Sequence, residues 1–208
     1  MLHKIARIPQ HLRFCRDVYK QRGRVREFLG FLDCTSQERI GSIFPNESDF
    51  LRRLVVEAGS FPGPIIELGT LFGFATNVIA DAKRPAQQLV TVDNFCWNPL
   101  GFTPYHHREF TRHSLHYVLR NCNTELFVGD CQQFWEQYAG PPPALVFIDA
   151  NHEYEFVKKD IERAVEKGAR IVAGHDYTAT WPSVQRAVTE SFGEDFEVVE
   201  SLWAHRMA

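Results

Sequence analysis

Residues 65–76 read IIELGTLFGFAT, a short apolar run that ends in a turn with two glycines and continues into a helical pattern. A buried strand followed by such a turn and by a helix N-terminus is typical of nucleotide sites in open parallel α/β sheets. The spacing of Gly69 and Gly73 differs from GxGxxG, because Leu71 occupies the second glycine position. The turn therefore favours a nucleoside-type ligand and disfavours NAD or FAD.

Short apolar runs alternate with helical stretches through the rest of the chain. Strands are predicted at residues 64–68, 89–93, 125–128, 144–149 and 169–173. Because these runs are apolar on both faces and separated by helices, they predict a parallel sheet that is covered on both sides. The runs at 195–201 and 202–207 have almost nothing between them, so they predict an antiparallel hairpin.

The first 59 residues follow a different pattern. Apolar residues at helical spacing predict helices at 14–31 and 47–58, and GSFPGP at 59–64 ends the second one. We therefore expect an N-terminal helical segment, 1–59, that packs on a domain formed by 60–208. Residues 1–26 carry eight Lys or Arg against Asp17, for which a solvated helix face is favoured over an organelle-targeting peptide.

Composition and charge narrow the class of protein. The 208 residues suit one large core, and 23 basic against 26 acidic side chains give a formal net charge of −3. This balance disfavours nucleic acid and anionic membranes as partners. The sequence has no apolar run of the roughly 20 residues that span a bilayer, no secretory signal, and no CxxC among its five cysteines. A cytoplasmic protein is the expectation.

Acidic residues follow three of the predicted strands. Asp93 closes LVTVD, Asp130 follows LFVG, and Asp149 follows LVFI. The carboxyl ends of parallel strands are where open α/β sheets bind ligands, so one crevice is expected to hold all three. Asp93 is suited to accept hydrogen bonds from ribose hydroxyls, although a capping or turn aspartate has the same pattern.

Taken in order, these motifs resemble a known family. ELGT at 67–70 with Gly73, Asp93, Gly129-Asp130, FIDANHEYEFVKKDI at 147–161 and IVAGHDY at 171–177 resemble a class I S-adenosylmethionine-dependent methyltransferase. The chain is most similar to the small-molecule O-methyltransferase branch, which includes macrolide-sugar O-methyltransferases and cephalosporin hydroxylase-like proteins. The resemblance covers residue 60 to the C-terminus. It implies a Rossmann-like three-layer sandwich with a seven-stranded, mostly parallel sheet whose last strand is antiparallel.

The resemblance also implies a cofactor, S-adenosylmethionine, an acceptor hydroxyl on a sugar-like or polyketide-like small molecule, and roles for single residues. Gly69 and Gly73 would lie near the methionine part of the cofactor with Glu67 below them, and Asp93 would hold the ribose. The full set of predicted cofactor-binding residues is Glu67, Gly69, Thr70, Gly73, Thr76, Asp93, Asp130, Cys131 and Asp149.

A metal site and a base are expected beside the cofactor. Asp149 and the pair His175-Asp176 end adjacent predicted strands, and carboxylates with room for water suit a divalent cation such as Mg²⁺. Relatives in this branch bind such a metal with acids here, whereas the imidazole of His175 suits softer ions. His152, three residues after Asp149, is the predicted general base. A helix cap or a surface histidine is the plainer alternative.

The insertion at about 95–120 is aromatic and rich in histidine. It is predicted to cover the acceptor as a lid or to form a contact in a homo-oligomer, with Trp97, Phe102, Tyr105, His106, His107 and Arg108 as the residues concerned. Three other functions compete with methyl transfer. They are a binding or hydroxylase-type protein on the same fold, a nicotinamide-dependent oxidoreductase, and a nucleic-acid methyltransferase.

Overall fold

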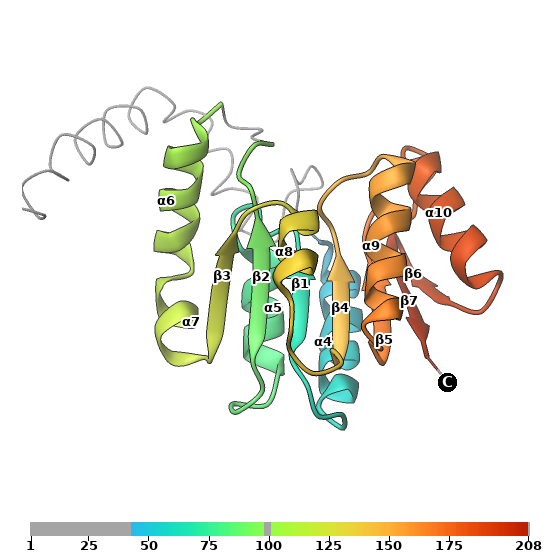
Figure 1. Ribbon diagram of the computed structural model, residues 1–208, viewed down its shortest axis with the longest axis horizontal. Coiled ribbons are helices and arrows are strands. Elements are labelled where there is room, and N and C mark those ends of the chain that lie inside the picture. Colours follow the sequence, from blue (N-terminus) through green and yellow to red (C-terminus); the bar gives the residue numbers. More distant parts are fainter. Residues whose placement is uncertain (1–42, 98–100, 208) are drawn as a thin grey trace, which may run out of the picture.

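Short runs rich in apolar residues form the central strands of the sheet. The computed structural model of the protein describes residues 43–97 and 101–207 (Figure 1). The helix predicted at 14–31 and the basic residues of positions 1–26 lie outside the described residues. In the part that is described, the strands are β1 (Ile65–Leu68), β2 (Leu89–Asp93), β3 (Thr124–Val128), β4 (Leu145–Ile148), β5 (Ile171–Gly174), β6 (Glu197–Val199) and β7 (Leu202–Arg206).

The sheet has the predicted topology. Over the described residues it contains seven strands in the order β3-β2-β1-β4-β5-β7-β6, and β7 runs antiparallel to both of its neighbours. β1, β4 and β5 are buried along their whole length, as strands covered on two faces must be. The prediction of a Rossmann-like sandwich with an antiparallel last strand is confirmed, and the predicted strand bounds differ from these by two residues or fewer at most ends.

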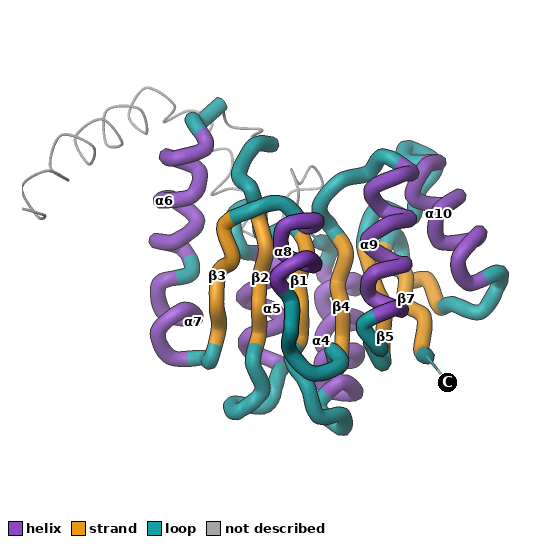
Figure 2. The backbone as a smooth tube through the Cα atoms, in the orientation of Figure 1, coloured by secondary structure: helices purple, strands orange, loops and turns teal. Residues whose placement is uncertain are grey.

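Helices cover both faces of the sheet (Figures 1 and 2). α4 (Pro45–Ala58) and α5 (Phe74–Ala82) pack on one face together with α7 (His116–Asn121), and their buried side chains share one hydrophobic cluster. α8 (Cys131–Gln137), α9 (Tyr154–Glu166) and α10 (Pro182–Phe192) cover the other face and contribute to a second cluster. α6 (Pro104–Ser114) stands beside the β3 edge.

α4 shows how sequence places a helix against the core. Pro45 occupies its first turn, and the side chain of Glu47 accepts the backbone N–H of Phe44 at 2.6 Å, which caps the helix N-terminus. Phe50 and Leu54 lie one turn apart on the buried face. The helix thus begins with its capping residue beside His175, the residue that follows β5.

The order of the strands creates a crevice. The chain runs outward through β1, β2 and β3 and then returns to the other side of β1 with β4. The two crossovers therefore leave in opposite directions at the carboxyl ends of β1 and β4, the arrangement at which open α/β sheets bind ligands. Among the described residues, no helix combines the length and the apolar character needed to cross a membrane.

Candidate active site

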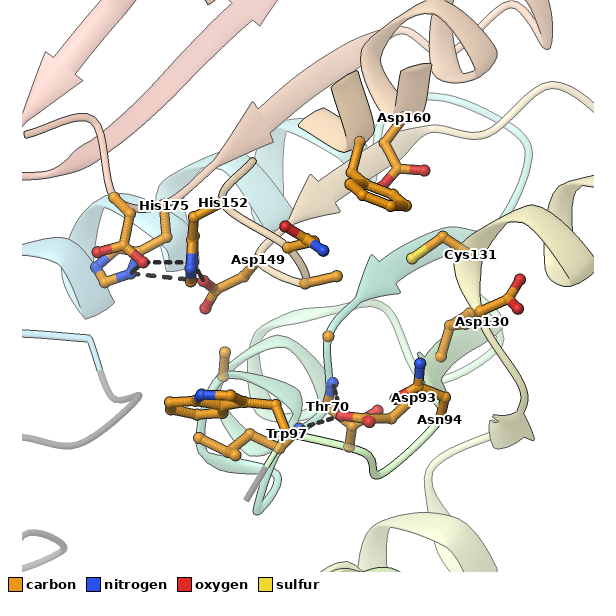
Figure 3. A pocket seen from close by; sticks show the side chains of 18 of the residues that line it. Thr70, Asp93, Asn94, Trp97, Asp130, Cys131, Asp149, His152, Asp160 and His175 are labelled. Atoms are coloured by element: carbon orange, nitrogen blue, oxygen red, sulfur yellow. Dashed lines mark hydrogen bonds and ion pairs between the residues drawn. The ribbon is translucent and has the colours of Figure 1, made fainter. Parts of the chain in front are cut away.

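A cavity of about 1050 Å³ opens at the carboxyl ends of the strands. Figure 3 shows its two ends, with Asp149, His152 and His175 on one side and Asp93, Asp130 and Cys131 on the other. The predicted site residues that line it are Gly69, Thr70, Asp93, Asp130, Cys131, Asp149, His152, His175 and Asp176. Glu67, Gly73 and Thr76 are outside its lining and lie behind the wall. Nine of the twelve predicted site residues therefore share one cavity.

The turn after β1 is fixed by close backbone packing. Gly69 has a φ of 98°, and a Cβ there would be 2.1 Å from the carbonyl oxygen of Asp149 at the end of β4. Gly73 has a φ of 86°, and a Cβ there would meet the side chain of Leu115 at 2.6 Å. Both positions therefore require glycine because of neighbouring protein atoms, a reason that the sequence pattern did not reveal.

Leu71, at the second glycine position of GxGxxG, has the backbone conformation that a glycine would adopt there. It adopts a left-handed backbone conformation, φ 48°, that glycine adopts without strain and leucine rarely does. Its N–H donates to the Asp93 carboxylate at 2.7 Å, and its carbonyl accepts from the Thr111 hydroxyl at 2.5 Å and lies 3.0 Å from Nε2 of His107. These contacts stabilise the unusual conformation and hold the turn in one shape.

Asp93 has backbone partners on both of its oxygens. Oδ2 accepts from the N–H groups of Thr70 and Leu71, at 3.0 and 2.7 Å, and Oδ1 accepts from Phe95 at 2.6 Å. Burial raises the pKa of Asp93 although these hydrogen bonds oppose it. Each carboxylate oxygen can accept two hydrogen bonds, so Oδ1 keeps capacity for a ligand hydroxyl while the aspartate shapes the turn.

Glu67 lies under the turn as a fully buried carboxyl group. Its Oε2 accepts from the hydroxyls of Thr76 and Thr91, at 2.6 and 2.5 Å, and Thr91 is also 2.5 Å from the hydroxyl of Thr70. Burial raises the pKa of Glu67 to about 8. Its Oε1 is buried and has no hydrogen-bond partner among the described residues. Glu67 is therefore mostly neutral at pH 7.

The predicted lid mainly supports the turn. Of the six lid residues predicted, Trp97 lines the cavity and the other five do not. α6 instead approaches the turn through His107 and Thr111 at the Leu71 carbonyl and through Ser114, whose hydroxyl donates to the Phe72 carbonyl at 2.8 Å. The insertion thus braces the wall of the cavity from behind.

At the end of the cavity beyond β3, the predicted residues Asp130 and Cys131 are joined by two that the sequence did not single out, Trp135 and Asp160. Asp130 caps α8 by accepting the N–H of Gln133 at 2.7 Å, and Cys131 follows it. Trp135 of α8 donates its indole N–H to Asp160 of α9 at 3.2 Å. Burial raises the pKa of Asp160 to about 6. Both Trp135 and Asp160 line the cavity, and Asp160 offers it a buried hydrogen-bonding carboxyl group.

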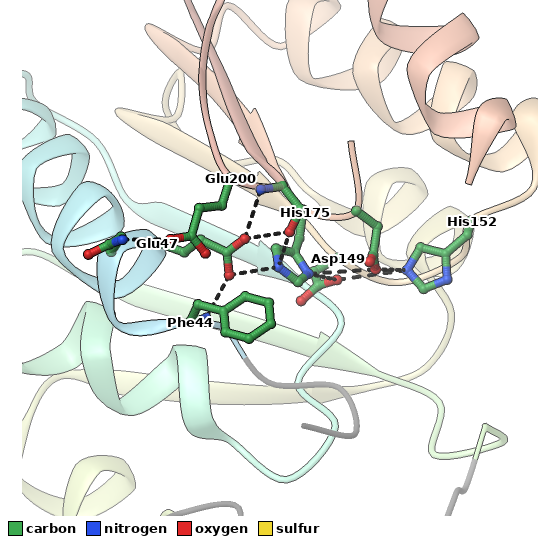
Figure 4. A network of polar contacts seen from close by, with 9 residues as sticks. Phe44, Glu47, Asp149, His152, His175 and Glu200 are labelled. Carbon is green, nitrogen blue, oxygen red and sulfur yellow. Dashed lines mark hydrogen bonds and ion pairs between the residues drawn. The ribbon is translucent and has the colours of Figure 1, made fainter. Parts of the chain in front are cut away.

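Four ionisable side chains converge at the other end, after β4 and β5. Nε2 of His152 is 2.8 Å from Oδ2 of Asp176 and 3.8 Å from Oδ1 of Asp149. Nδ1 of His175 is 3.6 Å from Oδ2 of Asp176 and 3.7 Å from Oδ1 of Asp149. The convergence predicted for Asp149, His175 and Asp176 is therefore present (Figure 4), and His152 belongs to the same cluster.

The charges in this cluster depend on one another. Burial acts to lower the pKa of His152, but the neighbouring carboxylates of Asp149 and Asp176 outweigh it and raise this pKa to about 9. Burial acts to raise the pKa of Asp176, but His152 and His175 outweigh it and hold this pKa well below its ordinary value. In this arrangement His152 is mostly a cation at neutral pH, which is not the state of a general base.

Trp181 extends the cluster toward the open side of the cavity. Its ring lies against the imidazole of His152, with centroids 4.5 Å apart and an angle of 32° between the planes. It is 40% exposed and lines the cavity. An exposed aromatic face beside a charged cluster is a surface on which an apolar or sugar-like ligand can rest.

Glu47 reaches the cluster from α4. It is fully buried, and its Oε2 is 3.2 Å from Nε2 of His175. Burial acts to raise the pKa of Glu47, but the hydrogen bond and the charge of His175 outweigh it and lower the pKa. Sequence reasoning missed this residue, because a glutamate in the first turn of a helix is expected as a cap.

Asp149, His175 and Asp176 form a geometrically suitable cation site. One ligand atom from each of the three lies within 4.8 Å of the other two. Two carboxylate oxygens and one imidazole nitrogen are a ligand set found at Mn²⁺, Zn²⁺ and related ions. The residues therefore fit a divalent cation, and the nitrogen atom distinguishes the set from the oxygen-only sets that Mg²⁺ prefers.

Comparison with known proteins identifies the class. A family described as a methyltransferase domain matches residues 66–177, which is more than half of the chain. The chain belongs to this methyltransferase family, and the predicted class is confirmed. No curated protein sequence matches this chain.

Solved structures share the fold at low sequence identity. Cofactor-bound Rv0187 from MTB is 23% identical, with a TM-score of 0.62 over 86% of this chain and 87% of that one. The O-methyltransferase from Bacillus cereus in complex with SAH is 20% identical, with a TM-score of 0.62 over 88% and 90%. CalS11, a TDP-rhamnose 3'-O-methyltransferase of calicheamicin biosynthesis, is 21% identical, with a TM-score of 0.58 over 78% and 77%.

Proposed function

We propose that the protein transfers a methyl group from S-adenosylmethionine to a hydroxyl group of a small molecule. The observation that carries this proposal is the continuity of the cavity, which joins the turn after β1 and Asp93 to the ionisable cluster around Asp149. A cofactor held by the first group would have its reactive end beside the second. The match to a methyltransferase family and the SAH bound to the similar Bacillus cereus O-methyltransferase support the same cofactor.

The half of the cavity around β1, β2 and β3 suits the cofactor. Asp93 would accept from the ribose, and Asp130, Cys131 and the newly found Asp160 would surround the adenine. Gly69 and Thr70 would face the methionine part, with the unpaired buried oxygen of Glu67 beneath the turn. The cavity is large enough, since small-molecule pockets of about 300 to 1,000 Å³ hold most of a ligand of this size.

The half around β4 and β5 suits the acceptor and a divalent cation. Asp149, His175 and Asp176 would hold the cation, which supplies a positive charge that lowers the pKa of an acceptor hydroxyl. Trp181 offers the acceptor an aromatic face. A sugar-like or polyketide-like acceptor fits this mixture of a charged cluster and an apolar surface, and CalS11, a TDP-rhamnose 3'-O-methyltransferase, has the same fold.

His152 remains our choice for the group that accepts the proton of the hydroxyl. Its imidazole lies on the cavity wall and next to both acids. Its pKa of about 9 depends on the nearby carboxylates of Asp149 and Asp176. If these carboxylates held a cation, His152 would lose that stabilisation of its charged form, and its neutral form would be favoured as a base.

Calorimetric titration of the purified protein tests the cofactor. S-adenosylmethionine and S-adenosylhomocysteine should both bind, whereas NADH should not, because Leu71 projects where the dinucleotide turn has glycine. Failure of both adenosyl compounds to bind would leave a scaffold function, and binding of NADH alone would favour the oxidoreductase.

A methyl-transfer assay tests the acceptor. The protein is incubated with S-adenosylmethionine and Mn²⁺ or Mg²⁺ against nucleotide-activated sugars, glycosylated polyketides, RNA and DNA, and products are examined by mass spectrometry. Addition of one methyl group to a sugar-like or polyketide-like compound is the expected result. Methylation of nucleic acid alone would contradict the proposed acceptor.

Three further expectations from the sequence stay predictions. They are the cytoplasmic location, the division of the chain at residue 59, and the homo-oligomer. Size-exclusion chromatography with light scattering measures the last of these directly.

A further inference from the structure

Glu47 is held on both of its carboxylate oxygens by groups from separate parts of the fold. Oε2 accepts the backbone N–H of Phe44 at 2.6 Å. Oε1 accepts the backbone N–H of Ser201 at 2.9 Å and also the hydroxyl of Ser201. The side chain is fully buried, so these partners fix a carboxylate that has no freedom to move toward solvent (Figure 4).

This carboxylate determines which nitrogen of His175 faces the cavity. Nε2 of His175 is 3.2 Å from Oε2 of Glu47 and 2.9 Å from the hydroxyl of Ser201. A carboxylate only accepts hydrogen bonds, so with a cation between Asp149 and Asp176 the neutral imidazole would carry its hydrogen on Nε2, toward Glu47, and its lone pair on Nδ1. Nδ1 is the nitrogen that faces Asp149 and Asp176.

The distances around Nδ1 suit a bound ion. Nδ1 is 3.7 Å from the nearer oxygen of Asp149 and 3.6 Å from that of Asp176, longer than ordinary hydrogen bonds. Two ligand atoms that share one ion, each about 2.1 Å from it, are roughly 3 to 4 Å apart. The separations are therefore those of ligands around one ion rather than of a directly hydrogen-bonded ion pair.

We propose that Glu47 is a positioning residue for the cation site, which orients His175 so that Nδ1 is a ligand and thereby favours a transition-metal ion such as Mn²⁺ over Mg²⁺. A carboxylate behind a ligand histidine fixes its tautomer and strengthens it as a donor. Imidazole binds Mn²⁺ and later transition metals better than it binds Mg²⁺. This inference rests on the proposed function, because it assumes that the site binds a cation.

The first test measures cation affinity by calorimetry in the full-length protein, with MnCl₂ and MgCl₂ as the probes. The native protein should bind Mn²⁺ more tightly than Mg²⁺. Glu47→Gln should weaken Mn²⁺ binding by about 10- to 100-fold and leave the affinity for S-adenosylhomocysteine unchanged. Glu57→Gln is the matched control, since Glu57 lies on the same helix, is half-buried and contacts Arg206 away from the cluster. It should leave both affinities unchanged.

The second test identifies the ligand atom. Pulsed electron paramagnetic resonance of the Mn²⁺-loaded protein should show coupling to an imidazole nitrogen, and His175→Asp should abolish it and shift the preference toward Mg²⁺. If Glu47 acts through His175, adding Glu47→Gln to His175→Asp should have no further effect on Mn²⁺ affinity. If Glu47→Gln does not fold, as judged by circular dichroism, Ser201→Ala replaces it and should weaken Mn²⁺ binding in the same direction.

Three results would overturn the inference. They are Mn²⁺ bound without nitrogen coupling, an unchanged Mn²⁺ affinity in the folded Glu47 or Ser201 variant, and the absence of any divalent-cation binding. In each case, binding of S-adenosylhomocysteine and methyl transfer in the same preparations would leave the methyltransferase proposal standing. Loss of cofactor binding in the native protein would instead contradict the proposed function itself.

Discussion

Two fully buried glutamates lie behind the residues that line the cavity, and their pKa values are shifted in opposite directions. Glu67, under the turn after β1, has hydroxyl partners and two aspartates, Asp93 and Asp149, in its surroundings, and burial raises its pKa to about 8. Glu47, beneath the end of β5, faces the imidazole of His175, and its pKa is lowered. Both have the same side chain and the same exposure, so the partners decide the charge.

The two glutamates belong to two regions of the site, and different kinds of interaction hold the two regions together. The turn region between β1 and β2 depends on backbone hydrogen bonds, left-handed residues and glycines in tight contact, and its central glutamate is neutral. The cluster region after β4 and β5 depends on alternating acids and imidazoles. The first region is suited to recognise a ligand by shape and hydrogen bonds, and the second to hold charge and move a proton.

The largest expected effect is on turnover in the cluster region. His152→Ala should lower the rate of methyl transfer by about 10²- to 10⁴-fold, the usual contribution of a positioned acid–base group. The affinity for S-adenosylhomocysteine should stay within about twofold of native, because the proposed cofactor contacts lie in the turn region. Rates are measured at saturating cofactor and acceptor, and unchanged turnover would remove His152 from the mechanism.

In the turn region, the addition of a single methyl group should lower the free energy of unfolding. Gly69→Ala places a Cβ 2.1 Å from the Asp149 carbonyl oxygen at a φ of 98°, so we expect a loss of about 3 kcal/mol or more in the free energy of unfolding. Gly168→Ala is the control, because its φ is 75° but its nearest neighbour is an ordinary 3.5 Å away. It should cost about 1 to 2 kcal/mol. Equal losses in urea titrations would refute the packing argument.

The same substitution at the two glutamates should have different effects on the free energy of unfolding. Glu47→Gln removes a charge that pairs with His175, so the free energy of unfolding at pH 7 should fall by roughly 3 kcal/mol. Glu67→Gln replaces a neutral acid by a neutral amide, so stability should be unchanged or higher. Urea titrations of the two variants at pH 7 measure this directly, and destabilisation of similar size in both would break the comparison.

A smaller effect concerns pH. The pKa of Glu67 is raised on folding from an ordinary 4.5 to about 8, so its native state binds a proton that the unfolded state releases. Its contribution to stability is therefore complete below about pH 4.5 and is lost as the pH rises toward 8. Stability measured at intervals from pH 5 to 8 should fall less steeply in Glu67→Gln than in the native protein. Parallel curves would contradict the raised pKa.

The fold could be predicted because its signals are local. Each central strand is a run of apolar residues followed by a turn, as in LVFI before Asp149, and the hairpin of β6 and β7 has almost no loop. The rule that parallel strands end at one edge was enough to bring Asp149, His152, His175 and Asp176 together. These predictions needed no knowledge of side-chain contacts.

The parts that could not be predicted depend on contacts between distant segments. Glu47 is 128 positions from His175 and looks like an ordinary cap. Asp160 lies within an amphipathic helix, and its proximity to Trp135 depends on how α8 and α9 pack. Trp181 and Ser201 carry no local signal of a site. Of the six residues of the insertion named from the sequence, Trp97 lines the cavity, and α6 contacts the turn from behind, so whether the insertion covers an acceptor or forms an oligomer contact stays a prediction.

A crystal structure of the protein with S-adenosylhomocysteine and Mn²⁺, with anomalous diffraction data collected for manganese, tests the central claim most directly. We predict adenosine against Asp93 and Asp130, sulfur between the turn after β1 and Asp149, and one manganese peak within bonding distance of Asp149, Asp176 and Nδ1 of His175. Adenosine at the β4–β5 end, or manganese bound elsewhere, would contradict the division of the cavity into a cofactor half and a cation half.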